Sequence, residues 1–326
     1  MDAGSALKLL RMEELGQNLE FFNGFGGFVE EGKEYEILLD GSKPPAPWIN
    51  VIANKNFGFF VSETGAGFTW ANNSRENKIT PWSNDPVSDR ASEAIYIFDE
   101  ITGEVMTPMS LGKTDHGIYQ VRHGFGYTKF LHEEDNLDQE LSVFTPLDEP
   151  VKLWNLKLTN QSDNVKYLSL TYYVEWVLGT NREQTSPYIV TNYSNEHEYL
   201  SAKNIYTFNF GNSSAFQFSS DMINSYTGDR QEFLGLKGSV LHPQGVEAKL
   251  SNHTGACYDS CGVIRVSVAV NPKESKTVVF GLGMSSDTKE IHTLRHKYQD
   301  TRMAENELNK VKTYWDKMLG TIRVRT

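Results

Sequence analysis

Short apolar runs, broken by turn residues, recur from residue 35 to residue 282. Residues 137–144 show the pattern most clearly, since Leu137, Leu141 and Val143 alternate with polar positions. A period of two places every second side chain on one face of a strand, so one face is buried and the other is solvated. The same signal, or a continuous apolar run, predicts strands at 35–39, 49–53, 57–61, 68–70, 95–98, 117–121, 127–132, 151–158, 167–176, 263–270 and 277–282.

Two segments within this pattern carry more specific expectations. The polar residues 160–164 separate two runs and predict a hairpin between 151–158 and 167–176. Residues 205–220 alternate aromatic side chains, and such a stripe favours sheet core over a sugar platform. The chain is therefore predicted to be all-β with antiparallel sheets.

The period changes at the two ends of the chain. Asp287 can cap a helix, and the apolar positions that follow it keep a spacing of three or four residues until Gly320. This spacing predicts one long helix, or two helices with a break near Thr301. Residues 5–15 carry a shorter helical pattern.

Composition narrows the range of partners. The 326 residues are 39% hydrophobic and 12% aromatic, enough for a large core, and the net charge is −11. That charge argues against a nucleic-acid backbone or an anionic membrane surface as the main partner. The sequence has no apolar run of 18 residues and no secretory h-region. Cys257 and Cys261 could hold a metal only with two more ligands, and although His253 is nearby no C-x-x-C motif occurs; a disulfide is an alternative, but a structural turn with free thiols is expected.

Common catalytic motifs are absent from the sequence. The turn at 65–67 lacks the lysine of a phosphate loop, and no G-x-S-x-G or H-E-x-x-H motif occurs. Glu63, Glu76, Asp85 and Asp89 are acidic but receive no catalytic role, because backbone capping accounts for the aspartates. His123 follows an arginine in a run that is expected to be structural.

Residues 44–89 are the most distinctive stretch. Apolar runs flank the polar segment 72–77, which lies between Trp70 and Trp82. Amide, hydroxyl, guanidinium and carboxylate groups offer directional donors and acceptors for sugar hydroxyls, and an indole can cover a pyranose ring. The alternative interpretation is an exposed loop between two core tryptophans.

Several long motifs in this stretch resemble a known family. They read PPAPW, SETGAGFTW, NSREN and TPWSNDPVSD, and the likeness continues at 122–127, 173–179 and 227–235. Together they resemble the N-terminal β-supersandwich domain of family 94 glycoside phosphorylases, closest to the phosphorylase-like region of cyclic β-1,2-glucan synthases. The resemblance covers roughly residues 20–320 and is far more specific than one short motif.

The resemblance implies a fold and a division into segments. The fold is a large antiparallel β-supersandwich, galactose mutarotase-like, with a C-terminal linker helix. Residues 1–20 are then a short N-terminal helical or linker segment, 21–286 the carbohydrate-binding supersandwich, and 287–326 a helical linker toward an (α/α) barrel catalytic domain that this chain lacks.

The resemblance also implies a function. The chain is expected to be the carbohydrate-binding and architectural domain of a β-glucan phosphorylase or cyclic β-1,2-glucan synthase, a hexosyl-transferring enzyme whose catalytic acid lies in the barrel. The chain alone is expected to be inactive. No cofactor is expected, and inorganic phosphate is the co-substrate of the parent. The expected partners are a β-glucan oligosaccharide, the barrel and, in a homodimer, a second copy. The expected location is the cytoplasmic side, and the parent is either a synthase anchored in the inner membrane or a soluble phosphorylase.

The predicted site residues are all carbohydrate contacts; no catalytic and no metal-binding residue is assigned. The two loops that carry most of them are expected at one end of the sandwich, exposed, because a buried arginine would need paired carboxylates. Glu175 precedes the second loop, where the plain interpretation is a solvated carboxylate. The predicted contacts are Asn73, Ser74, Arg75, Glu76, Asn77, Trp82, Asn181, Arg182, Gln184 and Arg230.

Two other functions stay open from the sequence. One is a stand-alone mutarotase-type sugar epimerase, which needs a histidine and glutamate acid–base pair on the concave face of a sheet. The other is a purely structural dimerisation module without sugar contacts.

Overall fold

The computed structural model describes residues 15–322 apart from 42, 114–116, 208 and 257–258. The predicted helical segment at 5–15 therefore lies almost entirely outside the described residues. Eighteen strands are described, and every pair between them is antiparallel. The predicted antiparallel supersandwich followed by a helical segment is confirmed.

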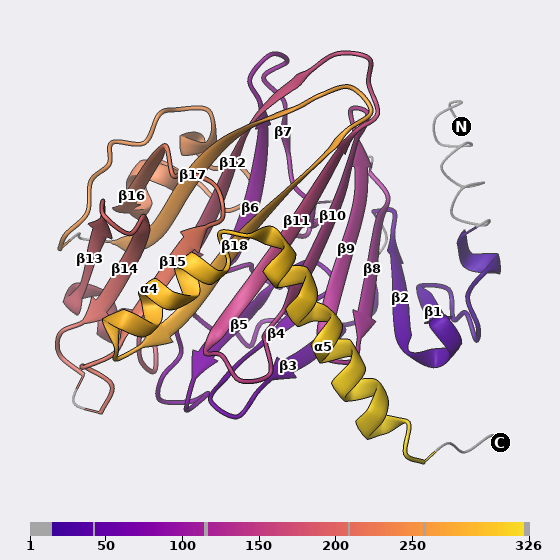
Figure 1. The fold of residues 1–326 in the computed structure, drawn as a ribbon, viewed down its shortest axis with the longest axis horizontal. Helices are drawn as coiled ribbons and strands as arrows, with labels where there is room; N and C mark the ends of the chain where they lie inside the picture. Colours follow the sequence, from indigo (N-terminus) through magenta and orange to yellow (C-terminus); the bar gives the residue numbers. More distant parts are fainter. Residues whose placement is uncertain (1–14, 42, 114–116, 208, 257–258, 323–326) are drawn as a thin grey trace.

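The largest sheet has ten strands in the order β1-β2-β8-β9-β10-β11-β18-β15-β14-β13 (Figure 1). Hairpins join most neighbours, because short polar turns separate consecutive alternating runs. Its strands are β1 (Gly26–Val29), β2 (Glu34–Leu39), β8 (Tyr119–Gly124), β9 (Tyr127–Glu134), β10 (Leu137–Phe144), β11 (Val151–Asn160), β13 (Ile189–Ser194), β14 (Tyr199–Asn204), β15 (Ser214–Ser219) and β18 (Ser275–Ser285).

Two smaller sheets form the second layer. The five-stranded sheet has the order β16-β17-β12-β6-β7, and the three-stranded sheet has the order β3-β4-β5. Their strands are β3 (Ile49–Ala53), β4 (Phe57–Ser62), β5 (Gly67–Ala71), β6 (Glu93–Asp99), β7 (Val105–Met106), β12 (Lys166–Glu175), β16 (Ser225–Asp229) and β17 (Ser260–Val270).

The predicted hairpin between 151–158 and 167–176 is wrong. β11 pairs with β10 and β18 in the large sheet, whereas β12 pairs with β6 and β17 in the five-stranded sheet. The connection therefore crosses from one layer to the other. Asn160 fixes this crossing, since its Nδ2 donates to the carbonyls of Asn164 and Val270 at 2.7 and 2.9 Å.

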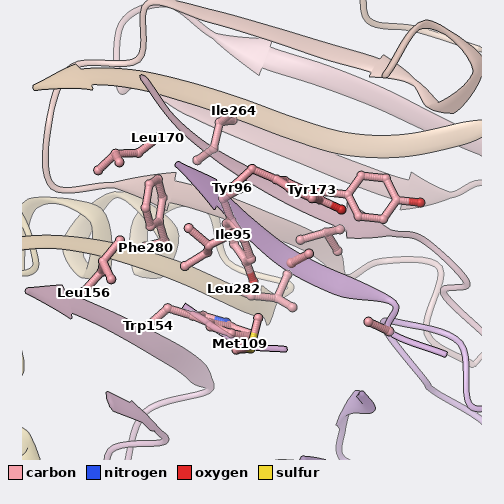
Figure 2. Close-up of a cluster of buried hydrophobic side chains, with 14 of the residues drawn as sticks. Ile95, Tyr96, Met109, Trp154, Leu156, Leu170, Tyr173, Ile264, Phe280 and Leu282 are labelled. Atoms are coloured by element: carbon pink, nitrogen blue, oxygen red, sulfur yellow. The ribbon is translucent and has the colours of Figure 1, made fainter. Parts of the chain in front are cut away.

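The main core fills the space between the layers. Figure 2 shows side chains from both layers in this core. Trp154 and Leu156 come from β11 and Phe280 from β18, and they meet Leu170 of β12 and Ile264 of β17. All five side chains are fully buried. Removing their apolar surface from water stabilises the packing of the two layers.

Two helices cover the outer face of the large sheet (Figure 1). They are α4 (Thr288–Lys297), capped by Asp287, and α5 (Thr301–Leu319), which ends at Gly320. The predicted helical pattern, its cap, its break and its stop are confirmed. Leu308 and Val311 bury the apolar stripe of α5 in a second core. A Cβ at Gly126 would lie 2.4 Å from Trp315 Nε1, so glycine lets the β8–β9 turn approach α5.

Three further details differ from the sequence interpretation. Cys261 lies inside β17 and is buried, so it does not belong to a turn; Cys257 lies outside the described residues. Among the described residues of the aromatic stripe, Phe216 and Phe218 of β15 are core, whereas Tyr206 lies before that strand and is exposed; Phe208 lies outside the described residues. Short helices were not predicted: α2 (Arg182–Thr185), α3 (Arg230–Leu234), η1 (Glu30–Gly32), η2 (Ser186–Tyr188) and η3 (Gln244–Val246).

Candidate functional site

A polar pocket lies where the five-stranded and three-stranded sheets meet. Its cavity measures about 330 Å³. Four chain segments line it: the connection after β5, the residues before β6, the end of β12 with the start of α2, and the first residue of α3. The lining residues are Pro81, Trp82, Ser83, Arg90, Ala91, Ser92, Glu175, Val177, Thr180, Asn181, Arg182, Glu183 and Arg230.

Glu175, the last residue of β12, is the electrostatic centre of this pocket. Its side chain is buried, and its carboxylate lies 2.9 Å from Arg182 Nε, 3.5 Å from Arg230 Nε and 3.5 Å from Arg90 Nη2. Tyr173 donates a hydrogen bond to the same carboxylate at 3.3 Å. The interpretation of Glu175 as a solvated carboxylate is therefore wrong, because three guanidinium groups compensate its burial.

A second carboxylate completes the cluster. Asp259 pairs with Arg182 Nη2 and, at 3.2 Å, with Arg230 Nη1. The side chains of Arg182 and Arg230 keep only 24% and 17% of their exposure. Arg182 is thus half-buried between two carboxylates, contrary to the expectation that it would be exposed. Paired guanidinium groups of this kind are held in a fixed orientation.

Tyr173 stays a hydroxyl at neutral pH. Burial, then the negative charge of Glu175, raises the pKa of Tyr173 well above its usual value. Its oxygen accepts a hydrogen bond from Arg230 Nε at 3.1 Å while its proton points to Glu175. The tyrosine therefore positions Arg230 relative to the carboxylate.

Trp82 forms the apolar side of the pocket. About half of its surface is exposed, an unusual amount for an indole. Its ring stacks on the buried Phe68 with a centroid separation of 5.8 Å. One face of the indole therefore packs on Phe68, and part of the ring stays accessible to a ligand.

The two predicted loops lie side by side, as expected, and their place at one end of the sandwich stays a prediction. Lys78 joins them: its Nζ donates to the carbonyls of Arg75 and Thr180, both at 2.9 Å. Its backbone also pairs with Gly179. Four of the ten predicted contacts line the pocket, namely Trp82, Asn181, Arg182 and Arg230. Their role as sugar contacts remains a prediction.

The other predicted contacts do not line the pocket. Asn73 accepts from the backbone N–H groups of Arg75 and Glu76, which closes the loop on itself. Arg75 is 88% exposed and pairs with Glu76 at 3.2 Å, while Ser74 is exposed. Asn77 is buried and donates to the carbonyl of Ala71 at 2.8 Å, so it is a structural residue.

Asn181 and Gln184 share a local capping role. Asn181 Oδ1 accepts from the backbone N–H of Gln184 at 3.0 Å and so caps α2. Gln184 is exposed and its Oε1 accepts from the Thr180 hydroxyl at 3.3 Å. The cap fixes Arg182 at the first position of α2, with its side chain toward Glu175.

Sequence reasoning missed three members of the charged cluster at the pocket, namely Arg90, Glu175 and Asp259. Arg90 follows directly after the TPWSNDPVSD motif and could have been included with it. Glu175 lies within the quoted run 173–179, but its burial depends on contacts with distant segments. Asp259 carried no local signal, because it belongs to the connection before β17.

Asp85, Asp89 and His123, which were expected to be structural, make hydrogen bonds that stabilise turns and strands. Asp85 caps a turn through Val87 and Ser88, and Asp89 accepts hydrogen bonds from Ser62 and Thr64 at 2.7 and 2.6 Å. The ring nitrogens of His123 lie within hydrogen-bonding distance of Thr128 Oγ1 and the Trp48 carbonyl. Burial lowers the pKa of His123 to about 4, so its ring is neutral at physiological pH.

The arrangement suits binding better than proton transfer. No histidine lines the pocket, and each acid in the cluster faces arginines. Within the described ranges, no group of three or more histidine, cysteine or acidic side chains could hold a metal ion. Across that same part of the chain, no helix is both long and apolar enough to cross a membrane.

Comparison with known proteins identifies relatives along nearly the whole chain. The model of the "Glycosyl hydrolase 94, supersandwich domain" family matches residues 33–301. The cyclic beta-(1,2)-glucan synthase NdvB of Rhizobium meliloti (strain 1021) is 36% identical over 315 residues, which are 95% of this chain and 11% of the relative. The N,N'-diacetylchitobiose phosphorylase of Vibrio proteolyticus is 26% identical over 93% of this chain and 38% of its own.

A solved structure supports the fold independently. A bacterial glucoamylase complexed with acarbose aligns with a TM-score of 0.51 and 10% identity, over 86% of this chain and 40% of that protein. At this identity the likeness concerns the fold alone. The chain thus spans a minority of the length of each of these relatives.

Proposed function

This chain belongs to the supersandwich domains of the glycosyl hydrolase 94 family, and we propose that it forms one wall of a glucan-binding cleft in a larger synthase or phosphorylase. The chain would contribute binding and architecture, and the catalytic acid would lie in another domain of the parent. The observation that carries the proposal is the pocket in which the exposed Trp82 ring stands near three arginines held by Glu175 and Asp259.

The chemistry of this pocket matches that of a sugar. A pyranose ring has an apolar face that packs on an indole, and its hydroxyls need both donors and acceptors at fixed angles. Arg90, with half of its side chain exposed, offers donors, while Glu183 and Asn181 offer acceptors on the same rim. A neutral ligand also fits the charge, since Arg90, Arg182 and Arg230 are matched by Glu175, Glu183 and Asp259.

The relatives indicate the substrate class. One is a cyclic beta-(1,2)-glucan synthase and another is an N,N'-diacetylchitobiose phosphorylase. We therefore propose a β-glucan oligosaccharide as the ligand. Inorganic phosphate would be the co-substrate of the parent, an (α/α) barrel of the parent would close the cleft, and no cofactor is needed in this chain. A homodimer and a cytoplasmic-side location belong to the same proposal.

Binding to the chain alone should be weak. Affinity for sugars depends on preorganised groups on both sides of the ligand, and this chain offers one wall. We expect a dissociation constant of roughly millimolar order for β-1,2-linked gluco-oligosaccharides. Saturation-transfer NMR detects binding in this range and reports which sugar protons contact the protein.

The decisive variant is Trp82→Ala. Removing the stacking surface should weaken oligosaccharide binding about tenfold, from the typical contribution of an aromatic contact. Tyr167→Ala is the matched control, because Tyr167 is an exposed aromatic residue at the opposite end of β12 from Glu175. Equal saturation transfer from all three proteins to the oligosaccharide, or none from the wild type, would exclude this pocket as a glucan site.

A further inference from the structure

A second cavity of about 300 Å³ lies between α5 and the edge of the large sheet, and it shares no lining residue with the pocket described above. Its floor is formed by Glu34 of β2, Arg122 of β8 and Tyr127 of β9. Lys312 and Asp316 of α5 form the opposite wall. The volume corresponds to roughly ten water molecules at liquid density. Figure 1 shows α5 running diagonally across the large sheet.

One side of this cavity is basic and poorly compensated. Lys312 is half-buried, and its Nζ lies 4.4 Å from the centre of the Tyr127 ring. Among the described residues no carboxylate lies within ion-pair distance of Lys312. Lys129 stands nearby, and its carboxylate partner, Glu140, is 3.7 Å away. Burial, then the charge of Lys129, lowers the pKa of Lys312.

The opposite side carries a carboxylate oxygen without a donor. Glu34 Oε1 accepts the hydroxyl proton of Tyr127, whereas Oε2 is buried and accepts no hydrogen bond from the described residues. Arg122 Nη1 is 3.6 Å from Oε2, and the guanidinium is instead engaged by Glu36 at 2.7 Å. A buried acceptor without a donor is unfavourable unless a ligand or water supplies one.

Three further charged side chains line the cavity: Lys33, Asp316 and Glu30. Lys33 Nζ pairs with Asp316 Oδ2 at 2.9 Å and so links η1 with the C-terminal half of α5. Phe125 lies at the rim and is 39% exposed. The cavity therefore offers an apolar edge, one lysine without an ion pair among the described residues, a second lysine whose carboxylate partner is 3.7 Å away, and one acceptor that lacks a donor.

We infer that this cavity binds a hexose-sized sugar that carries one anionic group. The anion would lie between Lys129 and Lys312, and a sugar hydroxyl would donate to Glu34 Oε2. Neither half of such a ligand suffices: a neutral sugar leaves Lys312 without an ion pair, and a small inorganic anion leaves the carboxylate oxygen without a donor. The ligand would also tie α5 to the β8–β9 hairpin.

Isothermal titration with glucose 6-phosphate tests this inference, with glucuronate, glucose and inorganic phosphate as comparison ligands. We expect glucose 6-phosphate or glucuronate to bind at least about tenfold more tightly than glucose or inorganic phosphate, since each partial ligand forgoes one charge-assisted contact. Which of the two anionic sugars binds better identifies the anion as a phosphate or a carboxylate. Equal affinity for glucose and both anionic sugars would overturn the inference.

Variants locate the binding site. Lys312→Met keeps the length of the side chain and should weaken binding of the anionic sugar about tenfold, and Lys129→Met should act in the same direction. Lys310→Met is the matched control: it lies on α5, is 64% exposed and pairs with Glu307. An affinity that is unchanged by Lys312→Met but reduced by Trp82→Ala would place the ligand in the first pocket and refute the second site, without affecting the proposed glucan wall.

Discussion

The central role of Glu175 can be tested by removing its charge while keeping its shape. In Glu175→Gln the three arginines that face this side chain lose their common counter-charge. Asp259 still pairs with Arg182 and Arg230 but does not reach Arg90 in the described contacts. The variant therefore leaves a cluster with an excess of positive charge at the end of β12.

The size of the effect follows from burial. Removing one partner of a buried ion pair costs about 3–5 kcal/mol, because the other charge stays desolvated. Arg182 and Arg230 are one-quarter to one-sixth exposed and Arg90 is about half exposed, so water screens part of the loss. We expect a decrease of about 2–4 kcal/mol in the free energy of unfolding.

Urea unfolding followed by circular dichroism measures this change directly. Glu183→Gln is the matched control, since Glu183 lines the same pocket but is exposed and has no ion pair among the described contacts; it should change stability by less than about 0.5 kcal/mol. A Glu175→Gln variant as stable as the wild type would refute the claim that this carboxylate holds the arginines in place.

Three further predictions concern the scaffold. Leu308→Ala should destabilise the protein by about 2–5 kcal/mol in chemical unfolding because the side chain is buried beneath α5, whereas Met318→Ala on the exposed end of that helix should be nearly neutral; equal effects would mean that α5 does not dock on the sheet. Burial raises the pKa of Glu63 to about 7, above its unfolded value. Its contribution to stability is therefore complete below about pH 4.5 and is lost as the pH rises through 7. The free energy of unfolding of Glu63→Gln should rise by roughly 2 kcal/mol relative to that of the wild type between pH 5 and pH 8. Lys152 and Glu93 form a buried pair at 3.1 Å, so Lys152→Met and Glu93→Gln should each cost about 3–5 kcal/mol, and the double variant should cost clearly less than their sum; additivity would contradict the pairing.

Helix caps and strand alternation are local signals, and they predicted the helices and strands that depend on neighbouring residues. The cap of α4 follows from Asp287 and the apolar spacing after it, and Gly320 ends α5 as expected, whereas Asp300, which caps α5, was not predicted. The strand runs were found for the same reason, since alternation is a property of neighbouring residues. Pairing is different: β12 joins β17, some ninety residues away, and no turn residue encodes that choice. The predicted hairpin failed on this point.

In the pocket, too, local motifs predicted some residues, whereas burial and ion pairing depend on distant segments. Trp82, Asn181, Arg182 and Arg230 were predicted from motifs, and they line one pocket. Burial could not be predicted from those motifs: Asn73 and Asn77 belong to one polar loop, yet Asn73 is exposed and Asn77 is buried. The counter-charges of the arginines come from β12 and from the connection before β17, so the pocket exists only after the sheets have assembled.

The claim that this domain forms a glucan wall is tested most directly by a crystal structure of the chain with a β-1,2-linked gluco-oligosaccharide at millimolar concentration. We predict one glucosyl ring stacked on the Trp82 indole, with its hydroxyls hydrogen-bonded to the Arg90 and Arg182 side of the pocket. An empty pocket with the oligosaccharide bound elsewhere, or no bound oligosaccharide at saturating concentration, would contradict the account.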